Sequence, residues 1–401
     1  MSRMDTLILN ARIATPKGSV PVVGENVEIY YANIGIKDGK ICYIGPEYLT
    51  DEEYDAGEIR TVDARGYLTT PGFVDAHTHL VFGGYRQNEY AKKIAGVSYL
   101  DILKEGGGIL STVESTRWED EDRLLNKSRN LVREMRAHGT TTIEAKSGYG
   151  LDLETELKQL KIVKELQEEG FNLVSTFMGA HAVPKYKTSD EFIEEVISWL
   201  PEVKNYAEFV DIFCEEGVFN LAQTEKFLRK AKEYGFGLKV HADEINNLGA
   251  SSLAGKLGAI SAEHLIEATE KDIEEMAKTG TIAVLLPTTS FYLDKPYAKA
   301  RLMMEKGVPI ALGTDFNPGS SPNFNMQLTM NIASLKYKLT PEEVLTAATL
   351  NSACAINRGS QVGTIEIGKR ADIIIWEAPD LDYFIYAFGS NKMFKTIVGG
   401  R

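Results

Sequence analysis

The sequence predicts an α/β fold, namely a (β/α)8 TIM-like barrel with a small composite β-sandwich domain formed by both chain ends. Between residues 71 and 359, short β-branched apolar runs alternate with charged amphipathic segments, as in strand–helix repeats of a parallel sheet. No Gly-x-Gly-x-x-Gly turn follows any of these strands, which favours a closed barrel over an open dinucleotide-binding sheet.

The chain ends have a different character. Near the start, the runs LILNARIAT and VEIYYANIGI are typical of strands, and the Lys-Asp-Gly-Lys turn at 37–40 predicts a hairpin. Near the other end, GTIEIGKRADIIIW (363–376) and MFKTIVGG have the same composition. We therefore expect residues 1–70 and 360–401 to build one composite domain beside a catalytic barrel at 71–359.

The barrel is expected to contain eight strands. They are predicted at 72–79, 140–146, 172–180, 209–215, 238–243, 259–265, 282–287 and 308–315. Leu153, Leu157, Leu160 and Val163 have helical spacing and predict a helix after the second strand. The longest break, 80–139, contains Gly106-Gly107-Gly108, which lacks the Lys-Ser/Thr of a phosphate loop and predicts a flexible turn near the barrel mouth.

Composition excludes several classes of function. The formal net charge of −13, without a dense Lys/Arg run, argues against nucleic acid or an anionic membrane as partner. No apolar stretch approaches a membrane span and the amino terminus has no export signal, so a soluble, unexported protein is expected. Three separated cysteines, with Cys214 in an apolar run, fit a reducing cytoplasm.

Reactive side chains gather where the predicted strands end, which is where chemistry occurs in such barrels. They are His77 and His79 at the end of the first strand, His181 after the third, His241 and Glu244 at the end of the fifth, His264 at the end of the sixth and Asp315 at the end of the eighth. Five of the six histidines therefore fall on one rim. The sixth, His138, ends a helix and is interpreted as structural.

A metal site is predicted on this rim. His77 and His79 point to the same face because side chains alternate along a strand. With His241 and Asp315 they form a set of three imidazoles and a carboxylate, which suits Zn or Fe in a catalytic site. Taken singly, His241 could be a core histidine and Asp315 could cap a turn. The agreement of separate strand ends favours the metal.

Such a metal would lower the pKa of a coordinated water and supply hydroxide for hydrolysis. Glu244 and His264 are the candidates for proton transfer and for stabilising developing charge. Arg86 could hold a substrate carboxylate and Tyr149 could cover a ring. The alternatives are a loop carboxylate for Glu244, a surface ion pair for Arg86 and simple packing for Tyr149.

Several motifs together resemble the imidazolonepropionase family of the amidohydrolase superfamily. They are PGFVDAHTHLVFGGYR, GGGILSTV, HGTTTIEAKSGYGLD, GAHAVP, CEEGVF, HADE, LGTDFNPGSSP and GKRADIIIW. The HxH, later His and later Asp pattern is shared across the superfamily, whereas KSGYGLD, GAHAVP and DFNPGSSP are narrow. The resemblance covers nearly the whole chain, although the first 70 residues are too generic to test it.

The resemblance implies hydrolysis of the cyclic amide of 4-imidazolone-5-propanoate to N-formimidoyl-L-glutamate in histidine degradation. It implies one Zn or Fe ion per chain held by His77, His79, His241 and Asp315. It further implies that Glu244, His264 and Asp315 serve catalysis, and that substrate or product contacts Arg86, Tyr149, His181, Glu244, Asn317, Gly319 and Ser320. In our mechanistic hypothesis, Asp315 accepts the proton of the attacking water and Glu244 delivers a proton to the departing nitrogen.

The sequence leaves open the number of metal ions, the exact reaction and the oligomeric state. The fourth strand ends Cys214-Glu215-Glu216, without the lysine that bridges two metals in related amidohydrolases, so one metal is expected. A deaminase of an aromatic amino-heterocycle is the closest rival function, and Arg86 discriminates against it only weakly. A scaffold that has lost catalysis is disfavoured because no ligand is missing. A homodimer acting on a small molecule is the default expectation.

Overall fold

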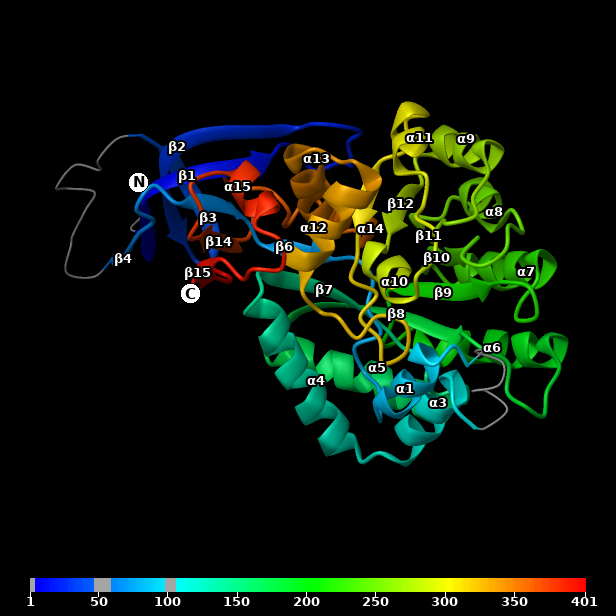
Figure 1. Ribbon diagram of the computed structural model, residues 1–401. Helices are drawn as coiled ribbons and strands as arrows, with labels where there is room; N and C mark the ends of the chain where they lie inside the picture. Colours follow the sequence, from blue (N-terminus) through cyan, green and yellow to red (C-terminus); the bar gives the residue numbers. More distant parts are fainter. Residues whose placement is uncertain (1–3, 47–58, 98–105) are drawn as a thin grey trace.

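The computed structural model describes residues 4–46, 59–97 and 106–401, which form an eight-stranded parallel sheet and a seven-stranded mixed sheet. Figure 1 shows the two units side by side, with both ends of the chain on the smaller sheet. The predicted α/β class, the barrel and the separate sheet at the chain ends are confirmed. Of the predicted composite unit, residues 1–3 and 47–58 lie outside the described residues.

All eight predicted barrel strands are present, in sequence order around the sheet. They are β6 (Phe73–Asp75), β7 (Thr140–Lys146), β8 (Asn172–Ala180), β9 (Phe209–Cys214), β10 (Gly237–Ala242), β11 (Ser261–His264), β12 (Ile282–Leu285) and β13 (Ile310–Leu312). The first and last strands meet just beyond their carboxyl ends. There the amide of His79 donates to the carbonyl of Phe316 at 2.9 Å, and the amide of Asp315 donates to that of His77 at 3.0 Å. Barrel closure thus brings the HxH segment against Asp315.

Helices cover the outside of the barrel (Figure 1). The helix predicted from leucine spacing is α5 (Leu153–Glu168), whose first turn is capped by Asp152 through the amide of Thr155 at 2.8 Å. The others that follow barrel strands are α4 (Glu121–Arg136), α6 (Ser189–Val203), α7 (Leu221–Glu233), α8 (Ala250–Leu257), α9 (Glu270–Thr279), α10 (Pro287–Tyr292), α11 (Ala300–Glu305) and α12 (Met326–Tyr337).

Shorter elements complete the chain. In the described part of the long break after β6, α1 (Gln87–Ile94) and α3 (Ile109–Trp118) precede α4. Beyond α12 come α13 (Pro341–Thr346), a π-helix (Ala347–Asn351), α14 (Ser352–Ala355) and α15 (Leu381–Tyr386). Among the described residues, no helix has the length and apolar character needed to span a membrane.

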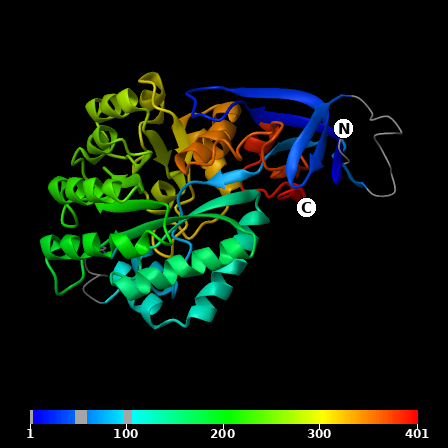
Figure 2. The same cartoon turned by 180° about the vertical axis from the view of Figure 1, so that it is seen from behind.

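The smaller sheet joins the two ends of the chain, and Figure 2 shows its blue strands beside the red carboxyl-terminal segment. Its strands are β1 (Thr6–Pro16), β2 (Val27–Lys37), β3 (Lys40–Gly45), β4 (Arg60–Asp63), β5 (Leu68–Pro71), β14 (Ile373–Trp376) and β15 (Met393–Ile397). The predicted hairpin turn is confirmed, since Asp38 and Gly39 have φ of 51° and 74° between β2 and β3. Isoleucines from β1, β2, β14 and β15 form a buried core of its own.

Trp376 packs between this sheet and the barrel. Its ring stacks on Phe73, the first residue of β6, with centroids 5.1 Å apart, and its Nε1 donates to Thr70 Oγ1 at 2.9 Å. Gly139, just before β7, has φ of +93°, and a Cβ there would lie 2.4 Å from the Trp376 ring. Only glycine fits this position. The domain limits at 70/71 and 359/360 stay a prediction, because strands β5 and β6 run on with a single residue between them.

Candidate metal centre and active site

The predicted ligands meet at the carboxyl ends of the barrel strands. Nitrogen atoms of His77, His79 and His241 lie within 4.8 Å of one another, and all three side chains are buried. Asp315 completes the group, since its Oδ1 lies 3.4 Å from Nε2 of His77 and 3.8 Å from Nε2 of His79. The structure therefore brings together the four residues that sequence reasoning selected.

The ligand set fits a metal ion. Nδ1 of His241 lies 3.0 Å from Oδ2 of Asp211, whereas its Nε2 is buried with no hydrogen-bond partner among the described residues. A histidine whose outer nitrogen bonds a carboxylate and whose inner nitrogen is unpaired has the arrangement of a metal ligand. Three imidazoles and a carboxylate are the donors that Zn and Fe accept.

A buried network of charged side chains lies beneath the ligands. Lys146 Nζ is 2.8 Å from both Glu144 and Asp211 and 3.1 Å from Glu263, while Lys239 is 3.0 Å from Glu263. Glu263 also contacts Nδ1 of His77. Because every member is fully buried, each charge depends on its partners for compensation. The network orients two of the ligands, His77 and His241.

Sequence reasoning did not select these five residues as site residues. The signal was present: Glu144, Lys146, Asp211, Lys239 and Glu263 are charged residues inside strands that are otherwise apolar or β-branched. In a barrel, such positions point inward when they alternate with residues facing the helices. Which carboxylate meets which lysine depends on strand tilt and register, so the pairings were not available from the sequence.

Burial keeps most of the imidazoles neutral. It lowers the pKa of His79 and His264 well below the usual value, and that of His181 to about 3, with neighbouring histidines adding to the effect. For His77, burial lowers the pKa but the charge of Glu263 outweighs it, giving about 9. Burial alone would raise the pKa of Asp315, yet His77 holds it below its ordinary range. A metal would take the place of the His77 proton.

The candidate acid–base residues lie beside the ligands. Nε2 of His264 is 3.6 Å from Oε2 of Glu244, and the His264 ring centroid is 5.0 Å from that of His241. Burial, helped by the charges of Asp315 and Glu215, raises the pKa of Glu244 to about 8. A carboxyl group that holds its proton at neutral pH can donate it. The backbone of His264 has φ of +70°, an unfavourable conformation for histidine that is typical of functional sites.

Two predicted substrate residues line the same space. His181 stacks on His79 with centroids 4.8 Å apart and planes 12° apart, and its Nδ1 lies 3.1 Å from the carbonyl of Gly148. The buried ring of Tyr149 is 5.6 Å from His79 and 5.4 Å from His181. These rings form one wall beside the ligands, suitable for a flat heterocycle.

The loop after β13 forms another wall. Oδ1 of Asn317 accepts the amides of Gly319 and Ser320, each at 2.8 Å, and its Nδ2 donates to Ser320 Oγ at 2.8 Å. Arg86 packs directly on this turn, because a Cβ placed on Gly319 would lie 1.0 Å from its Nη2. The structure thus gathers Asn317, Gly319, Ser320 and Arg86 at one place; their contacts with substrate stay a prediction.

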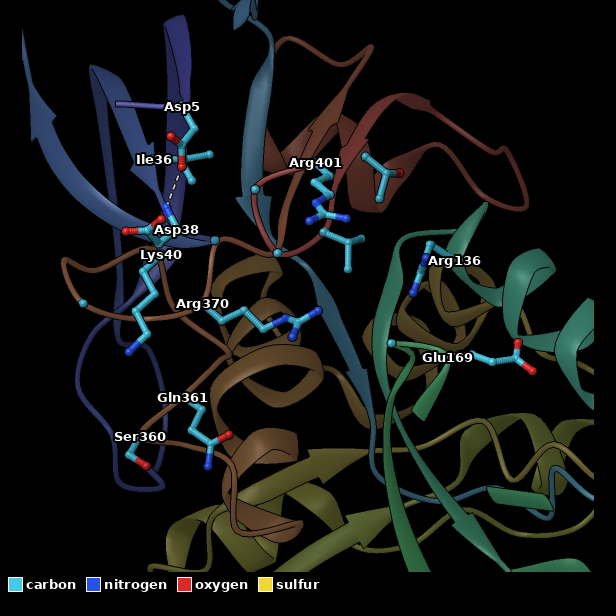
Figure 3. Close-up of a pocket in the computed structure, with 17 residues that line it drawn as sticks. Asp5, Ile36, Asp38, Lys40, Arg136, Glu169, Ser360, Gln361, Arg370 and Arg401 are labelled. Atoms are coloured by element: carbon cyan, nitrogen blue, oxygen red, sulfur yellow. Dashed lines mark hydrogen bonds between the residues drawn. The ribbon is translucent and has the colours of Figure 1, made fainter. Parts of the chain in front are cut away.

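Two cavities lie at opposite ends of the barrel. The smaller, about 390 Å³, opens beside Arg86 on the same face as the ligands, and we refer to it as the vestibule. The larger, about 1120 Å³, lies between the small sheet and the barrel, where Figure 3 shows Arg136 and Glu169 across from Arg370. Because Arg136 and Glu169 precede β7 and β8, it faces the amino-terminal end of the strands, away from the ligands.

Comparisons with known proteins agree with this geometry. Residues 68–401 match the model of the Amidohydrolase family. Imidazolonepropionase from Caldanaerobacter subterraneus subsp. tengcongensis is 49% identical over 98% of this chain and 97% of its own, and that from Bacillus velezensis is 49% identical over 100% and 97%. The chain belongs to the amidohydrolase family, among the imidazolonepropionases. The resemblance found in the motifs is thereby confirmed, and this amidohydrolase is a hydrolase of carbon–nitrogen bonds.

Solved structures of other enzymes share the overall architecture. The structure of an adenosine deaminase from Xanthomonas campestris with bound Zn has a TM-score of 0.72 at 21% identity, covering 100% of this chain and 92% of that chain. The 5-methylcytosine deaminase from Klebsiella pneumoniae has a TM-score of 0.77 at 15% identity, covering 98% and 97%. At such low identity, the likeness shows the architecture alone.

Proposed function

We propose that the protein hydrolyses the cyclic amide of 4-imidazolone-5-propanoate to N-formimidoyl-L-glutamate, with one Zn or Fe ion per chain held by His77, His79, His241 and Asp315. The observation that carries the proposal is a set of three imidazoles and a carboxylate beside an aromatic wall and the partly buried Arg86. Relatives named imidazolonepropionase, about half identical over nearly the whole chain, support the choice of substrate.

Asp315 and Glu244 carry out the two proton transfers of the proposed reaction. A bound Zn or Fe ion lowers the pKa of a coordinated water and so supplies hydroxide near neutral pH. Asp315, ionised because its pKa is held low, accepts the proton that the attacking water loses. Glu244, protonated because burial raises its pKa, donates a proton to the ring nitrogen as the C–N bond breaks. One water is consumed, and the ring carbonyl becomes a carboxylate.

The remaining residues bind and orient the ring. Arg86 pairs with the propionate, since its buried Nε has no hydrogen-bond partner among the described residues. Tyr149 and His181 pack against the ring, and an imidazole N–H of His264 donates a hydrogen bond to the oxygen of the reacting carbonyl. Asn317 holds the turn on which Gly319 and Ser320 present polar atoms to substrate or product.

The absence of a lysine at the end of β9 supports a single ion, and the charge of Lys146 supports it further. A second ion in related enzymes needs a carboxylated lysine, which must first lose its proton. Burial opposes the charge on Lys146, but three carboxylates outweigh it and raise its pKa. The protonated amine cannot be carboxylated. A cytoplasmic location and a homodimer are further parts of the proposal; unpaired cysteines fit the first, and the second rests on the prevalence of symmetric dimers.

The test mixes purified, metal-analysed protein with freshly made 4-imidazolone-5-propanoate and follows loss of the ring's ultraviolet absorbance. Turnover should stop with a chelator and with His241→Ala. His138→Ala is the matched control, because this histidine bonds a helix carbonyl away from the ligands and its loss should leave metal content and rate unchanged. A metal-loaded protein that leaves the ring intact would refute the substrate assignment, and a panel of amino-heterocycles would then test deamination.

A further inference from the structure

The vestibule is a cationic pocket on the face of the barrel that carries the proposed ligands. It is lined by Arg86, Lys93 and Gly319, by three tyrosines (Tyr85, Tyr90 and Tyr292), and by Gln87 and two prolines. Among the described residues that line it there is no acid. Low-dielectric walls around two like charges concentrate a positive potential there.

Lys93 and Arg86 are held together on one glycine. Lys93, half-buried on α1, donates from Nζ to the carbonyl of Gly319 at 2.9 Å, while the Arg86 guanidinium covers the α-carbon of the same residue. Burial lowers the pKa of Lys93 and the charge of Arg86 lowers it further. The charge of Glu89 compensates Lys93 only in part, and one oxygen of this carboxylate accepts the Gly108 amide at 2.8 Å. Two cations kept this close are stabilised by an anion between them.

The charge of the whole protein makes such a pocket useful. At a formal net charge of −13, the surface as a whole repels a carboxylate substrate. The proposed substrate carries a propionate, and its hydrolysis creates a second carboxylate. A local positive region at the entrance counters this repulsion over the last stretch of approach, where screening by salt is weakest.

We propose that Lys93 is a substrate-attracting residue that, together with Arg86, draws carboxylate ligands into the vestibule and leads them to the metal centre. This inference rests on the proposed function for its natural ligand, but the pocket's preference for carboxylates is a property of these side chains alone. Lys93 lies outside the set of residues that contact the reacting ring, and so acts on capture rather than on chemistry.

The first experiment compares Lys93→Gln with Lys92→Gln, which removes the same charge from the exposed neighbour on the same helix. Lys93→Gln should lower kcat/KM about three- to tenfold at about 20 mM salt, with unchanged kcat. The difference in kcat/KM between wild type and Lys93→Gln should narrow as salt is raised to about 500 mM, because screening weakens the attraction that Lys93 exerts. Lys92→Gln should have the kcat/KM of wild type at each salt concentration. Lys93→Arg, which keeps the positive charge, should do so as well.

A second readout separates this inference from the proposed function. Titration calorimetry measures the affinity for glutarate, a small dicarboxylate that serves as a probe for carboxylate binding. Lys93→Gln should bind glutarate more weakly than wild type and Lys92→Gln do. If the ring is not hydrolysed but glutarate binding depends on Lys93, the substrate assignment fails and the vestibule stands. If the ring is hydrolysed but neither kcat/KM nor glutarate binding changes in Lys93→Gln, the inference is wrong. A loss confined to kcat would also overturn it, since Lys93 would then act only by placing Gly319.

Discussion

Oδ2 of Asp211 lies 3.0 Å from Nδ1 of His241, and the same carboxylate lies 2.8 Å from Nζ of Lys146. One side chain thus connects a proposed metal ligand to the buried charge network. Asp211 also accepts the backbone amide of His241 at 3.0 Å, so it fixes both the ring and the strand that carries it. Orientation of this imidazole therefore depends on a residue outside the four proposed ligands.

Asp211→Ala should weaken metal affinity by about 10- to 100-fold, because His241 loses the partner that fixes its ring and tautomer. Competition with a chromogenic chelator measures this directly. Asp382→Ala, at an exposed position of α15, is the matched control and should leave the affinity as it is. Equal affinities in wild type and Asp211→Ala would show that the ring is held in place by packing alone.

Lys146→Met should lower the free energy of unfolding by about 3–5 kcal/mol, because three buried carboxylates lose a shared cation. Denaturant titration of the metal-free protein gives the value without interference from metal binding. Lys230→Met removes an exposed lysine paired with Glu233 and should leave the transition unchanged. If both variants unfold at the same denaturant concentration, the network makes no net contribution to stability.

Gly319→Ala should raise KM about 10- to 100-fold with a smaller effect on kcat, because displacing Arg86 removes a charged hydrogen bond to substrate. The added methyl group would lie 1.0 Å from Nη2 of Arg86, and the flexible end of that side chain can move away without unfolding the protein. A double-mutant cycle checks whether Gly319→Ala acts through Arg86. In an Arg86→Ala background the same change should have little further effect; an undiminished effect would place the cause elsewhere.

The raised pKa of Glu244 should be visible in how the stability of the protein depends on pH. Its folded-state pKa of about 8 lies above the ordinary value of 4.5, so the folded protein holds this proton where the unfolded chain has lost it. Stability from this group is complete below the unfolded pKa and is lost as pH rises through about 8. In metal-free protein, Glu244→Gln should therefore gain melting temperature over wild type increasingly from about pH 5 to about pH 8. A constant difference across this range would contradict the assignment.

The sequence alone was sufficient for the barrel and for choosing four candidate ligands that the structure brings together. Periodicity located all eight strands, and His77, His79, His241 and Asp315 could be chosen because a barrel collects the carboxyl ends of its strands on one face. The hairpin at Asp38 and Gly39 was equally local, since positive φ at two residues selects this turn. These features depend on neighbours within a few residues, or on a rule that holds for the whole fold.

Only the tertiary structure decided how distant charges pair. Lys146 meets Asp211 and Glu263, and Lys93 meets Gly319, across separations of 65 to 226 positions in the chain. Such contacts depend on strand register, on the tilt of the barrel and on how one loop folds over another, and nothing local in the sequence encodes them. The sequence by itself determined which groups lie on the rim. Packing determined which of these groups form ion pairs and hydrogen bonds with one another. The energies of such contacts change over distances shorter than the rise of one residue along a strand.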